Sequence, residues 1–287
     1  MILREIRRSY REELNALYAE TEADALFYWA AEEILNKKRV DAVACLPLAC
    51  GRHEEERFLS VLARLKTAEP IQYIFQKAFF DGLELEVNPS VLIPRGETEE
   101  LVQWAKEYLK EKENPLVLDL CTGSGAIAIA LSAAFPSACV HACDISSQAL
   151  RTAGENARRC GVEVDFFCWD VLSPALPPAL SDKAVFDLVI ANPPYVLPAE
   201  RERMRPNVLD YEPSLALFVP EDDPLLFYRR IAAIAIGSLK PEGWLLAEIN
   251  EALSERNEAL WGACGFKGVE IRRDIHGKPR MIRGIKP

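Results

Sequence analysis

The sequence lacks the long apolar runs and the metal-ligand spacings that would indicate a membrane protein or a zinc site. The longest apolar candidate, 126–135, is far shorter than the roughly 18 residues that a transmembrane helix needs. Only three histidines occur, and the eight cysteines form no Cys-x-x-Cys pair, so we predict no metal site. We expect the cysteines to be free, buried thiols in a reducing compartment.

The sequence also has no excess of positive charge. It carries 34 Lys and Arg against 44 Asp and Glu, a formal net charge of −10. Residues 1–80 hold 12 basic and 13 acidic side chains, so nearly all of the acidic excess lies further along. This balance argues against a protein that mainly grips phosphate backbones. Because the chain starts with a charged helical segment rather than a signal peptide, we expect it to be cytoplasmic.

The most informative stretch is an apolar run that stops at Asn192-Pro-Pro-Tyr195. Residues 186–190 predict a buried strand, and the two prolines end it because neither can donate to a sheet and each fixes its own φ. We therefore predict a rigid loop at the carboxyl end of a strand, where open α/β sheets bind their ligands.

The groups on this loop suit a planar nitrogen that carries two hydrogens. The side-chain oxygen of Asn192 and the carbonyl of Pro193 can each accept one hydrogen, while Tyr195 stacks on the plane. We predict Asn192, Pro193 and Tyr195 as catalytic residues, and Pro194 with them as the substrate-binding loop. The motif resembles that of methyltransferases acting on exocyclic or amide nitrogens, and both adenine amino groups and glutamine amides fit it.

A second motif, Asp119-Leu-Cys-Thr-Gly-Ser-Gly125, runs from a buried strand into a helix predicted over 126–134. Gly123 and Gly125 allow the backbone to approach a ligand, and the helix N-terminus supplies N–H donors. Alone, this pattern is compatible with any nucleotide-binding α/β protein. Its context is stronger, because the next strand ends at Asp144, about twenty residues on, as expected for a carboxylate that binds ribose hydroxyls.

A third strand, predicted over 164–170, ends with Trp169 and Asp170. An aromatic ring and a carboxylate at this position can flank an adenine, and an ordinary pair of residues at a strand end is the alternative. We predict a proline-rich loop over 173–182. Residues 196–217 favour a lid or substrate loop, or a solvated connection.

The spacing of apolar residues divides the chain into three parts. Residues 1–78 have apolar side chains at helical spacing and predict a small helical domain for substrate docking. Residues 79–90 alternate about Asp81-Gly82 and predict a β-hairpin linker. Residues 91–287 alternate strands with helices, which predicts a parallel doubly wound α/β sheet with an antiparallel end.

Two local predictions concern the segments beside the hairpin. Residues 69–74 favour an extended conformation, and residues 91–94 favour a short strand ended by Pro94, with a helix opening at 97–100. Arg95 and Glu97 either line the site or belong to a simple turn.

Taken together, these motifs resemble the release-factor glutamine N5-methyltransferases, the family called PrmC or HemK. The resemblance covers nearly the whole chain and rests on an ordered set of segments: Pro70–Ile74, Val91–Arg95 with Glu97–Glu99, Asp119–Gly125, Asp144–Ser146, Asn192–Tyr195, Glu212-Pro213 with Ala216-Leu217, and Asp274 with Gly277–Arg280. The departures, at Gln76-Lys77, Gly96, 219–221 and 249–250, lie outside the glycine-rich turn and the Asn-Pro-Pro-Tyr loop.

The resemblance implies a class I methyltransferase fold, S-adenosylmethionine as cofactor, and the glutamine of the Gly-Gly-Gln motif in class I peptide-chain release factors as methyl acceptor. The glutamine would be held by 192–195. An adenine-N6 methyltransferase acting on DNA or RNA is the alternative, which the acidic balance disfavours. We expect a monomer that contacts neither nucleic acid nor membrane. The cofactor-binding residues would be Asp119, Cys121, Thr122, Gly123, Ser124, Gly125, Asp144, Trp169, Asp170 and Asn192.

Overall fold

The computed structural model describes residues 1–177, 180 and 185–287, and the chain forms two compact units. A helical unit comprises Met1–Gln76 with Arg205–Tyr211, and a sheet unit comprises Lys77–Met204 with Glu212–Pro287. The predicted proline-rich loop at 173–182 lies partly outside the described residues. The chain therefore passes from one unit to the other at three points.

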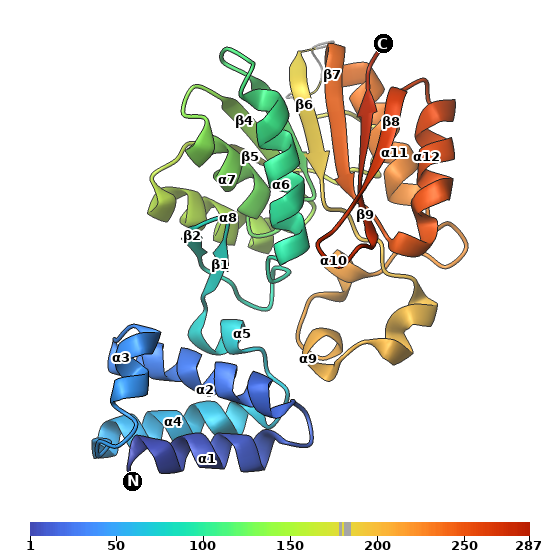
Figure 1. The fold of residues 1–287 in the computed structure, drawn as a ribbon. Helices are drawn as coiled ribbons and strands as arrows, with labels where there is room; N and C mark the ends of the chain where they lie inside the picture. The colour runs from blue at the N-terminus through green and yellow to red at the C-terminus, as the bar shows by residue number, and fades with distance from the viewer. Residues whose placement is uncertain (178–179, 181–184) are drawn as a thin grey trace. The chain divides into compact units, whose positions relative to one another are not determined.

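The helical unit is built around a cluster of aromatic rings. Tyr10 meets Phe27 edge-on with ring centroids 5.5 Å apart, and Phe27 stacks on Phe58 at 5.7 Å. The buried Tyr10 hydroxyl donates to the Phe58 carbonyl at 2.8 Å, so no polar atom of that ring is left unsatisfied. The helices, blue in Figure 1 apart from the last, are α1 (Leu3–Leu14), α2 (Glu20–Leu35), α3 (Arg39–Ala44), α4 (Arg52–Leu65), α5 (Ile71–Phe75) and α9 (Pro206–Leu209).

One prediction in this unit is wrong: the stretch expected to be extended forms α5. Pro70 takes the N-cap position, where its missing N–H costs nothing, and Gln76 ends the helix in a left-handed conformation at φ 54°. Five residues are too few to show the helical repeat on which the prediction depended.

Residues 205–211 pack with the helical unit although they lie about 130 residues further along the chain. Arg205 binds Glu22 through both terminal nitrogens, at 2.7 and 3.1 Å. The Tyr211 hydroxyl lies 2.9 Å from the Thr67 carbonyl, to which it donates. The middle of the predicted substrate loop is thus held by side chains of α2 and of the residues that follow α4.

The sheet unit alternates strands with helices, as predicted. Its strands are β1 (Ala78–Phe80), β2 (Leu83–Leu85), β3 (Leu116–Leu120), β4 (Cys139–Asp144), β5 (Asp165–Cys168), β6 (Phe186–Ala191), β7 (Leu239–Glu248), β8 (Lys267–Arg273) and β9 (Pro279–Ile285). Its helices are α6 (Gly96–Leu109), α7 (Ala126–Ala134), α8 (Ser147–Cys160), α10 (Ser214–Leu217), α11 (Leu226–Ser238) and α12 (Ser254–Ala263), with 3₁₀ turns at Pro198–Arg203 and Glu251–Leu253.

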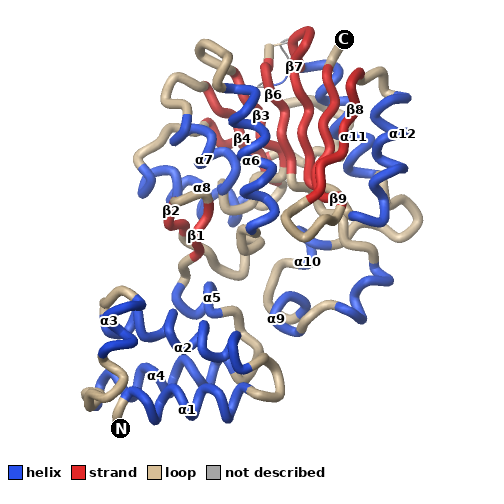
Figure 2. The backbone as a smooth tube through the Cα atoms, viewed as in Figure 1, coloured by secondary structure: helices blue, strands red, loops and turns tan. Residues whose placement is uncertain are grey.

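The central sheet has the strand order β5-β4-β3-β6-β7-β9-β8, shown in red in Figure 2. The pairs from β5 to β7 are parallel, while β9 pairs antiparallel with both β7 and β8. The predicted doubly wound sheet with an antiparallel end is confirmed. Because β3 lies between β4 and β6, the order reverses there, and the crevice at its carboxyl end is where such sheets bind ligands.

Alternating side chains give this sheet two buried faces. Leu118, Val189 and Leu245 belong to the cluster under α11 and α12, whereas their neighbours Val117, Leu188 and Leu246 pack with α6 and α7. Figure 1 shows these helices in layers on either side of the strands. A period of two along each strand therefore makes three layers, with every central strand covered on both faces.

Two smaller elements complete the unit. The Asp81-Gly82 turn joins β1 to β2 with φ values of 51° and 81°, the combination that a two-residue hairpin requires, and Phe80 and Leu85 pack into the α6 layer. The short strand expected at 91–94 does not form. Its backbone donors are used differently: Val91 N–H bonds to Asn88 O at 3.0 Å, and Ile93 N–H bonds to a Glu212 carboxylate oxygen at 3.2 Å.

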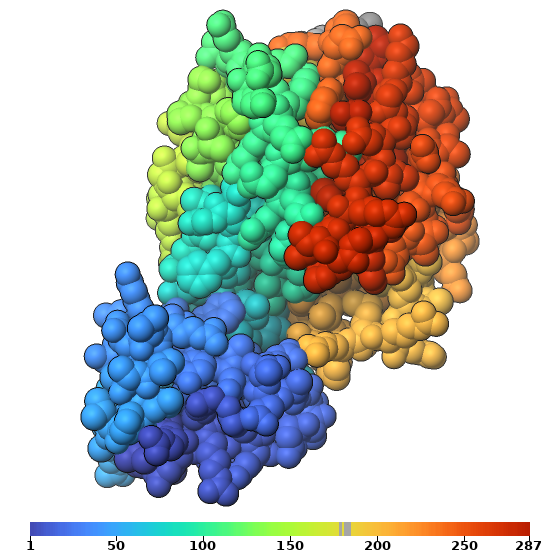
Figure 3. Space-filling model, viewed as in Figure 1, coloured from blue at the N-terminus to red at the C-terminus, as the bar shows by residue number. Residues whose placement is uncertain are grey.

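The C-terminal strands are tied to α6 at the surface. The Arg272 guanidinium lies 4.1 Å from the Trp104 ring centroid and 3.0 Å from a Glu107 carboxylate oxygen. Figure 3 shows these segments, green and red, sharing one surface. The eight cysteines are free, as predicted, but only Cys143 is buried, so the expectation of buried thiols is wrong for the others. Within the described residues no helix has the length and apolar character to cross a membrane.

We predict that Asp24→Asn lowers the stability of the helical unit by about 1–3 kcal/mol at neutral pH. The Arg11 and Arg7 guanidinium groups, which both bind Asp24, hold the pKa of its carboxyl below its usual value. That contribution is present above the unfolded-state pKa of about 4 and is lost as the pH falls through the lower folded-state value. Amide hydrogen exchange in α1 and α2 at several pH values measures this loss of stability.

The matched control for this variant is Glu12→Gln. The Arg8–Glu12 pair also joins an arginine of α1 to a carboxylate, but both side chains are largely exposed, so its loss should change the stability far less than the loss of Asp24 does. An Asp24→Asn difference that does not shrink below pH 4 would contradict the electrostatic explanation.

Candidate functional site

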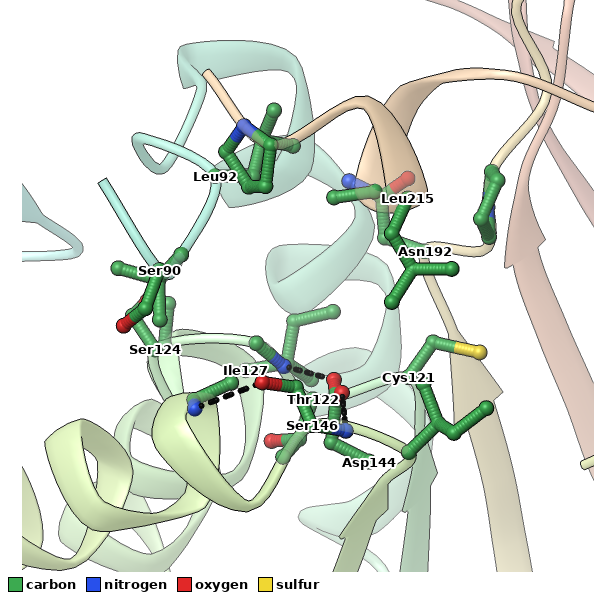
Figure 4. A pocket seen from close by; sticks show the side chains of 18 of the residues that line it. Ser90, Leu92, Cys121, Thr122, Ser124, Ile127, Asp144, Ser146, Asn192 and Leu215 are labelled. Carbon is green, nitrogen blue, oxygen red and sulfur yellow. Dashed lines mark hydrogen bonds between the residues drawn. The ribbon is translucent and has the colours of Figure 1, made fainter. Parts of the chain in front are cut away.

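A cavity of about 340 Å³ opens at the carboxyl ends of β3, β4, β5 and β6. Its volume lies in the range of sites for small molecules, and its walls are mostly apolar with a few polar groups. Figure 4 shows Thr122, Ser124, Asp144 and Ser146 along one side of it, with Leu92 and Leu215 across from them. The strand order thus brings together loops that are distant in sequence.

The two glycines of the turn that follows β3 have different structural roles. Gly123 has φ 56° and a Cβ there would meet no atom within 4 Å, so its backbone faces the open cavity. Gly125 has φ 82°, and a Cβ would lie 3.0 Å from Ala153 Cβ and 3.3 Å from Ala153 Cα. Gly125 therefore permits close packing of α7 on α8 and does not line the cavity. Cys121, also in a left-handed conformation at φ 62°, does line it.

Asp119 lies beneath this turn, completely buried, rather than in the cavity wall. Its Oδ2 accepts the Thr122 hydroxyl at 2.6 Å, while Oδ1 has no hydrogen-bond partner among the described residues. Burial raises the pKa of Asp119 to about 7, although the Thr122 bond opposes the shift. An unsatisfied buried acceptor below the cavity is the kind of group that a bound cation or donor would compensate.

Asp144, the last residue of β4, places its carboxylate at the cavity edge. Oδ1 accepts the Ser146 N–H and Oδ2 accepts the Gly123 N–H, each at 2.9 Å. Burial raises the pKa of Asp144, and these two backbone donors oppose the rise. Each oxygen keeps a second lone pair, so the carboxylate can still accept from a pair of hydroxyls. The Ser146 side chain also caps α8 by accepting the Ala149 N–H at 3.1 Å.

Trp169 and Asp170 both line the cavity just after β5. The Trp169 ring is 8% exposed and is fixed because its indole N–H donates to the Ala175 carbonyl at 3.0 Å. Asp170 Oδ1 accepts the Leu172 N–H at 2.8 Å. Ile145 and Leu172 also line the wall, so this part of it carries mainly apolar side chains and one carboxylate.

The Asn-Pro-Pro-Tyr loop follows β6, and its residues divide between the cavity and the interior. Asn192 and Pro194 line the cavity, whereas Pro193 is buried and Tyr195 lies behind the wall. Asn192 Nδ2 donates to Thr98 Oγ1 at 3.1 Å. The Tyr195 hydroxyl donates to Glu248 Oε1 at 2.6 Å, so that group is already engaged within the protein.

The residues Thr98 and Glu248 were not among the predicted site residues. Glu248 is 1% exposed and its Oε2 accepts the Thr98 hydroxyl at 2.6 Å. Burial raises the pKa of Glu248, and the hydroxyls of Thr98 and Tyr195 oppose the shift. One signal in the sequence was available: an acidic residue closes the otherwise apolar end of β7, where a charge would not be buried without a partner.

Arg95 and Glu212 join the two loops that border the cavity on its other side. Arg95 donates to the Glu212 carboxylate, which is 4% exposed and also accepts the Ile93 N–H at 3.2 Å. Arg95 lines the cavity, together with Pro213 and Leu215 from the segment that follows Glu212. The ion pair therefore fixes the start of α10 beside the residues that precede α6. Glu97 does not line the cavity.

The residues around the cavity fit S-adenosylmethionine. The Asp144 carboxylate suits two ribose hydroxyls, the wall at Ile145, Trp169 and Asp170 suits an adenine with an exocyclic amino group, and the unsatisfied Asp119 lies under the turn that a charged methionine portion would approach. In the part of the chain that the structure describes, no group of three or more His, Cys, Asp or Glu side chains could hold a metal ion.

Two family models match the chain. The model described as "Methyltransferase small domain" matches residues 101–206, and the one described as "PrmC N-terminal domain" matches residues 5–75. The first match contains the glycine-rich turn, Asp144 and the Asn-Pro-Pro-Tyr loop, and the second falls within the helical unit.

Curated relatives match over nearly their full length. The chain is 40% identical to the release factor glutamine methyltransferase of Flavobacterium psychrophilum over 286 residues, which is 99% of each protein. It is 38% identical to the protein of the same name from Bacteroides thetaiotaomicron, over 95% of this chain and 96% of the relative. The Streptococcus pneumoniae protein of that name is 37% identical over 98% of each.

Solved structures with low sequence identity share the fold. The Thermus thermophilus 16S rRNA N2 G1207 methyltransferase, in complex with AdoMet and guanosine, aligns with a TM-score of 0.53 at 17% identity, covering 74% of this chain and 50% of that one. A Pyrococcus furiosus methyltransferase aligns with a TM-score of 0.50 at 17% identity, over 75% and 93%. These likenesses establish a class I methyltransferase fold.

We predict that the same substitution has different effects at the two glycines: one variant loses stability and the other loses affinity for the cofactor. Gly125→Ala should cost about 1–3 kcal/mol of stability because its Cβ meets α8. Gly123→Ala adds mainly local backbone strain, and its methyl group enters the open cavity, so it should chiefly weaken cofactor binding. Thermal unfolding and calorimetric titration with S-adenosylmethionine measure both. Equal effects on stability and binding in the two variants would contradict this division.

Proposed function

This chain belongs to the release factor glutamine methyltransferase family, and from that premise we propose that it methylates class I peptide-chain release factors. The methyl group of S-adenosylmethionine is transferred to the side-chain amide nitrogen of the glutamine in the Gly-Gly-Gln motif. The observation that carries the proposal is that the amide of Asn192 borders the same cavity as the glycine-rich turn and Asp144.

The cofactor-binding residues proposed here are those of the sequence prediction. Cys121 to Ser124 would hold the methionine portion, Asp144 the ribose hydroxyls, and Trp169 with Asp170 the adenine. Gly125 and Asp119 support the turn from behind, as its packing and burial indicate. When bound, S-adenosylmethionine supplies a methyl group activated by a positively charged sulfur.

The Asn-Pro-Pro-Tyr loop would hold the acceptor. An amide nitrogen is a poor nucleophile, because its lone pair is delocalised into the carbonyl, so the protein must orient it. The Asn192 side-chain oxygen and the Pro193 carbonyl would each accept one of its hydrogens. Orientation of this kind supplies roughly 7–11 kcal/mol. The two hydrogen bonds strengthen as the nitrogen becomes positive, which stabilises the transition state.

The remaining roles are proposals of the same kind. Residues 1–78 would form the docking domain, 79–90 the hairpin linker, and 91–287 the methyltransferase domain. The protein would act in the cytoplasm as a monomer and would touch neither DNA nor RNA. The net charge of −10, almost all of it carried after residue 80, supports the absence of contact with nucleic acid. Light scattering on the purified protein tests the monomer.

The decisive experiment incubates the purified protein with S-adenosylmethionine and a class I release factor, and then measures the mass of the Gly-Gly-Gln peptide. One added methyl group is the expected result, and it should disappear when that glutamine is replaced by alanine. Parallel reactions contain duplex DNA and ribosomal RNA. Methyl transfer to a nucleic acid and none to the release factor would overturn the proposal in favour of an adenine-N6 methyltransferase.

We predict that Asn192→Ala abolishes turnover while the affinity for S-adenosylmethionine falls only modestly, because the lost oxygen contacts mainly the acceptor. Steady-state kinetics with release factor and calorimetry with cofactor separate the two effects. Near-normal turnover would show that Asn192 does not hold the acceptor.

A further inference from the structure

A buried carboxylate is linked to the Asn192 amide through one hydroxyl group. Glu248, the last residue of β7, accepts hydroxyl hydrogens from Thr98 and Tyr195, each at 2.6 Å. Two hydroxyl donors on its two oxygens match the ionised form, which can only accept. Glu248 is therefore the end point of a directed set of hydrogen bonds.

The direction of these bonds fixes the Thr98 hydroxyl. Threonine has one hydroxyl hydrogen, and in this site it is used on Glu248. Thr98 Oγ1 can then only accept from Asn192, so the Asn192 NH2 must be the group that lies 3.1 Å away. The two ends of an asparagine amide have nearly the same shape, and their hydrogen-bond partners decide the orientation.

The elements that meet here are set by the sheet register. Ala191 of β6 pairs with Ala247 of β7, so the next residues along both strands, Asn192 and Glu248, emerge side by side. Thr98 reaches them from the first turn of α6 and is 4% exposed. The chain also holds Tyr195 in place, since Asn250 Nδ2 donates to its carbonyl at 3.1 Å.

We propose that Thr98 and Glu248 are positioning residues that keep the Asn192 amide oxygen directed at the acceptor nitrogen. This inference rests on the proposed function of Asn192. A turned amide would present its own NH2 to the acceptor NH2, so two donors would face each other. The Thr98–Glu248 pair thus makes the site selective for methyl acceptors that donate hydrogen bonds. Glu248 acts through Thr98 and does not itself contact the methyl acceptor.

The test uses the full-length protein with Thr98→Val, Thr98→Ser and Glu248→Gln. Valine keeps the shape of threonine but cannot accept from Asn192, and glutamine presents an NH2 to one of the two hydroxyls. We expect kcat with release factor to fall at least about 100-fold in both, as for loss of one transition-state hydrogen bond. Serine keeps the hydroxyl and should retain kcat within about threefold.

A matched control removes a buried hydroxyl elsewhere. Ser238→Ala deletes a 4% exposed hydroxyl that donates to Ile234 O at the end of α11, and it should leave kcat unchanged. Calorimetry with S-adenosylmethionine should give a Kd within about threefold of wild type for every variant, which shows that the cavity is folded. A Thr98→Val enzyme with kcat within fivefold of wild type would overturn the proposal.

A second readout separates this inference from the proposed function. The Asn192 side-chain amide protons, followed by NMR, should be protected from exchange in the wild type and in Thr98→Ser, and unprotected in Thr98→Val. If the wild type binds S-adenosylmethionine but does not methylate a release factor, the proposed function fails and this measurement alone decides the role of Thr98. Equal exchange in all three proteins would refute the positioning role.

Discussion

The parallel pairing of β3 with both β4 and β6 is the constraint on which the site depends. Parallel strands end at the same edge, so the turn after β3, Asp144 after β4 and the loop after β6 lie around one cavity although up to about seventy residues separate them. A shift of one residue in this register would exchange the two faces of a strand and misplace its terminal side chain. The packing of both faces therefore also fixes the geometry of the site.

Three carboxylates lie at this edge, and each has different hydrogen-bond donors. Asp119 and Glu248 are buried, and Asp144 is partly exposed. Asp144 receives two backbone N–H donors, Glu248 receives two hydroxyls, and Asp119 receives one hydroxyl and keeps a free oxygen. Burial alone would push all three toward the neutral form. The hydrogen-bond donors at each carboxylate oppose this shift in its pKa.

The sequence was most informative where one residue type has few alternatives. Glycine at 123, an acid at the end of β4 and the two prolines after β6 each have a local physical reason, and they could be placed on strand ends without a structure. The sheet and its antiparallel end followed from the alternation of elements. These inferences needed only patterns within a few residues of each other.

What the sequence did not reveal depends on pairs that are far apart. The contact of Thr98 with Glu248 spans 150 residues. The acidic end of β7 indicates a buried carboxylate, but it does not indicate that Thr98 is its partner. The helix at 71–75 is too short for periodicity. In the strand expected at 91–94, the Ile93 N–H bonds instead to Glu212, which is more than a hundred residues away. The glycine at position 125 is explained by the packing of α7 on α8 and not by the approach of a ligand. This packing also joins residues that are far apart in the sequence.

The segment 205–211 limits which part of the gene can be exchanged between related proteins. Part of the helical unit is encoded within the coding region of the sheet unit, so the N-terminal 76 residues are not a cassette that recombination can exchange as one block. Replacing the first 76 residues alone could remove the Glu22 carboxylate that Arg205 binds. A substitution at Glu22 therefore changes a contact made by a residue more than a hundred positions later.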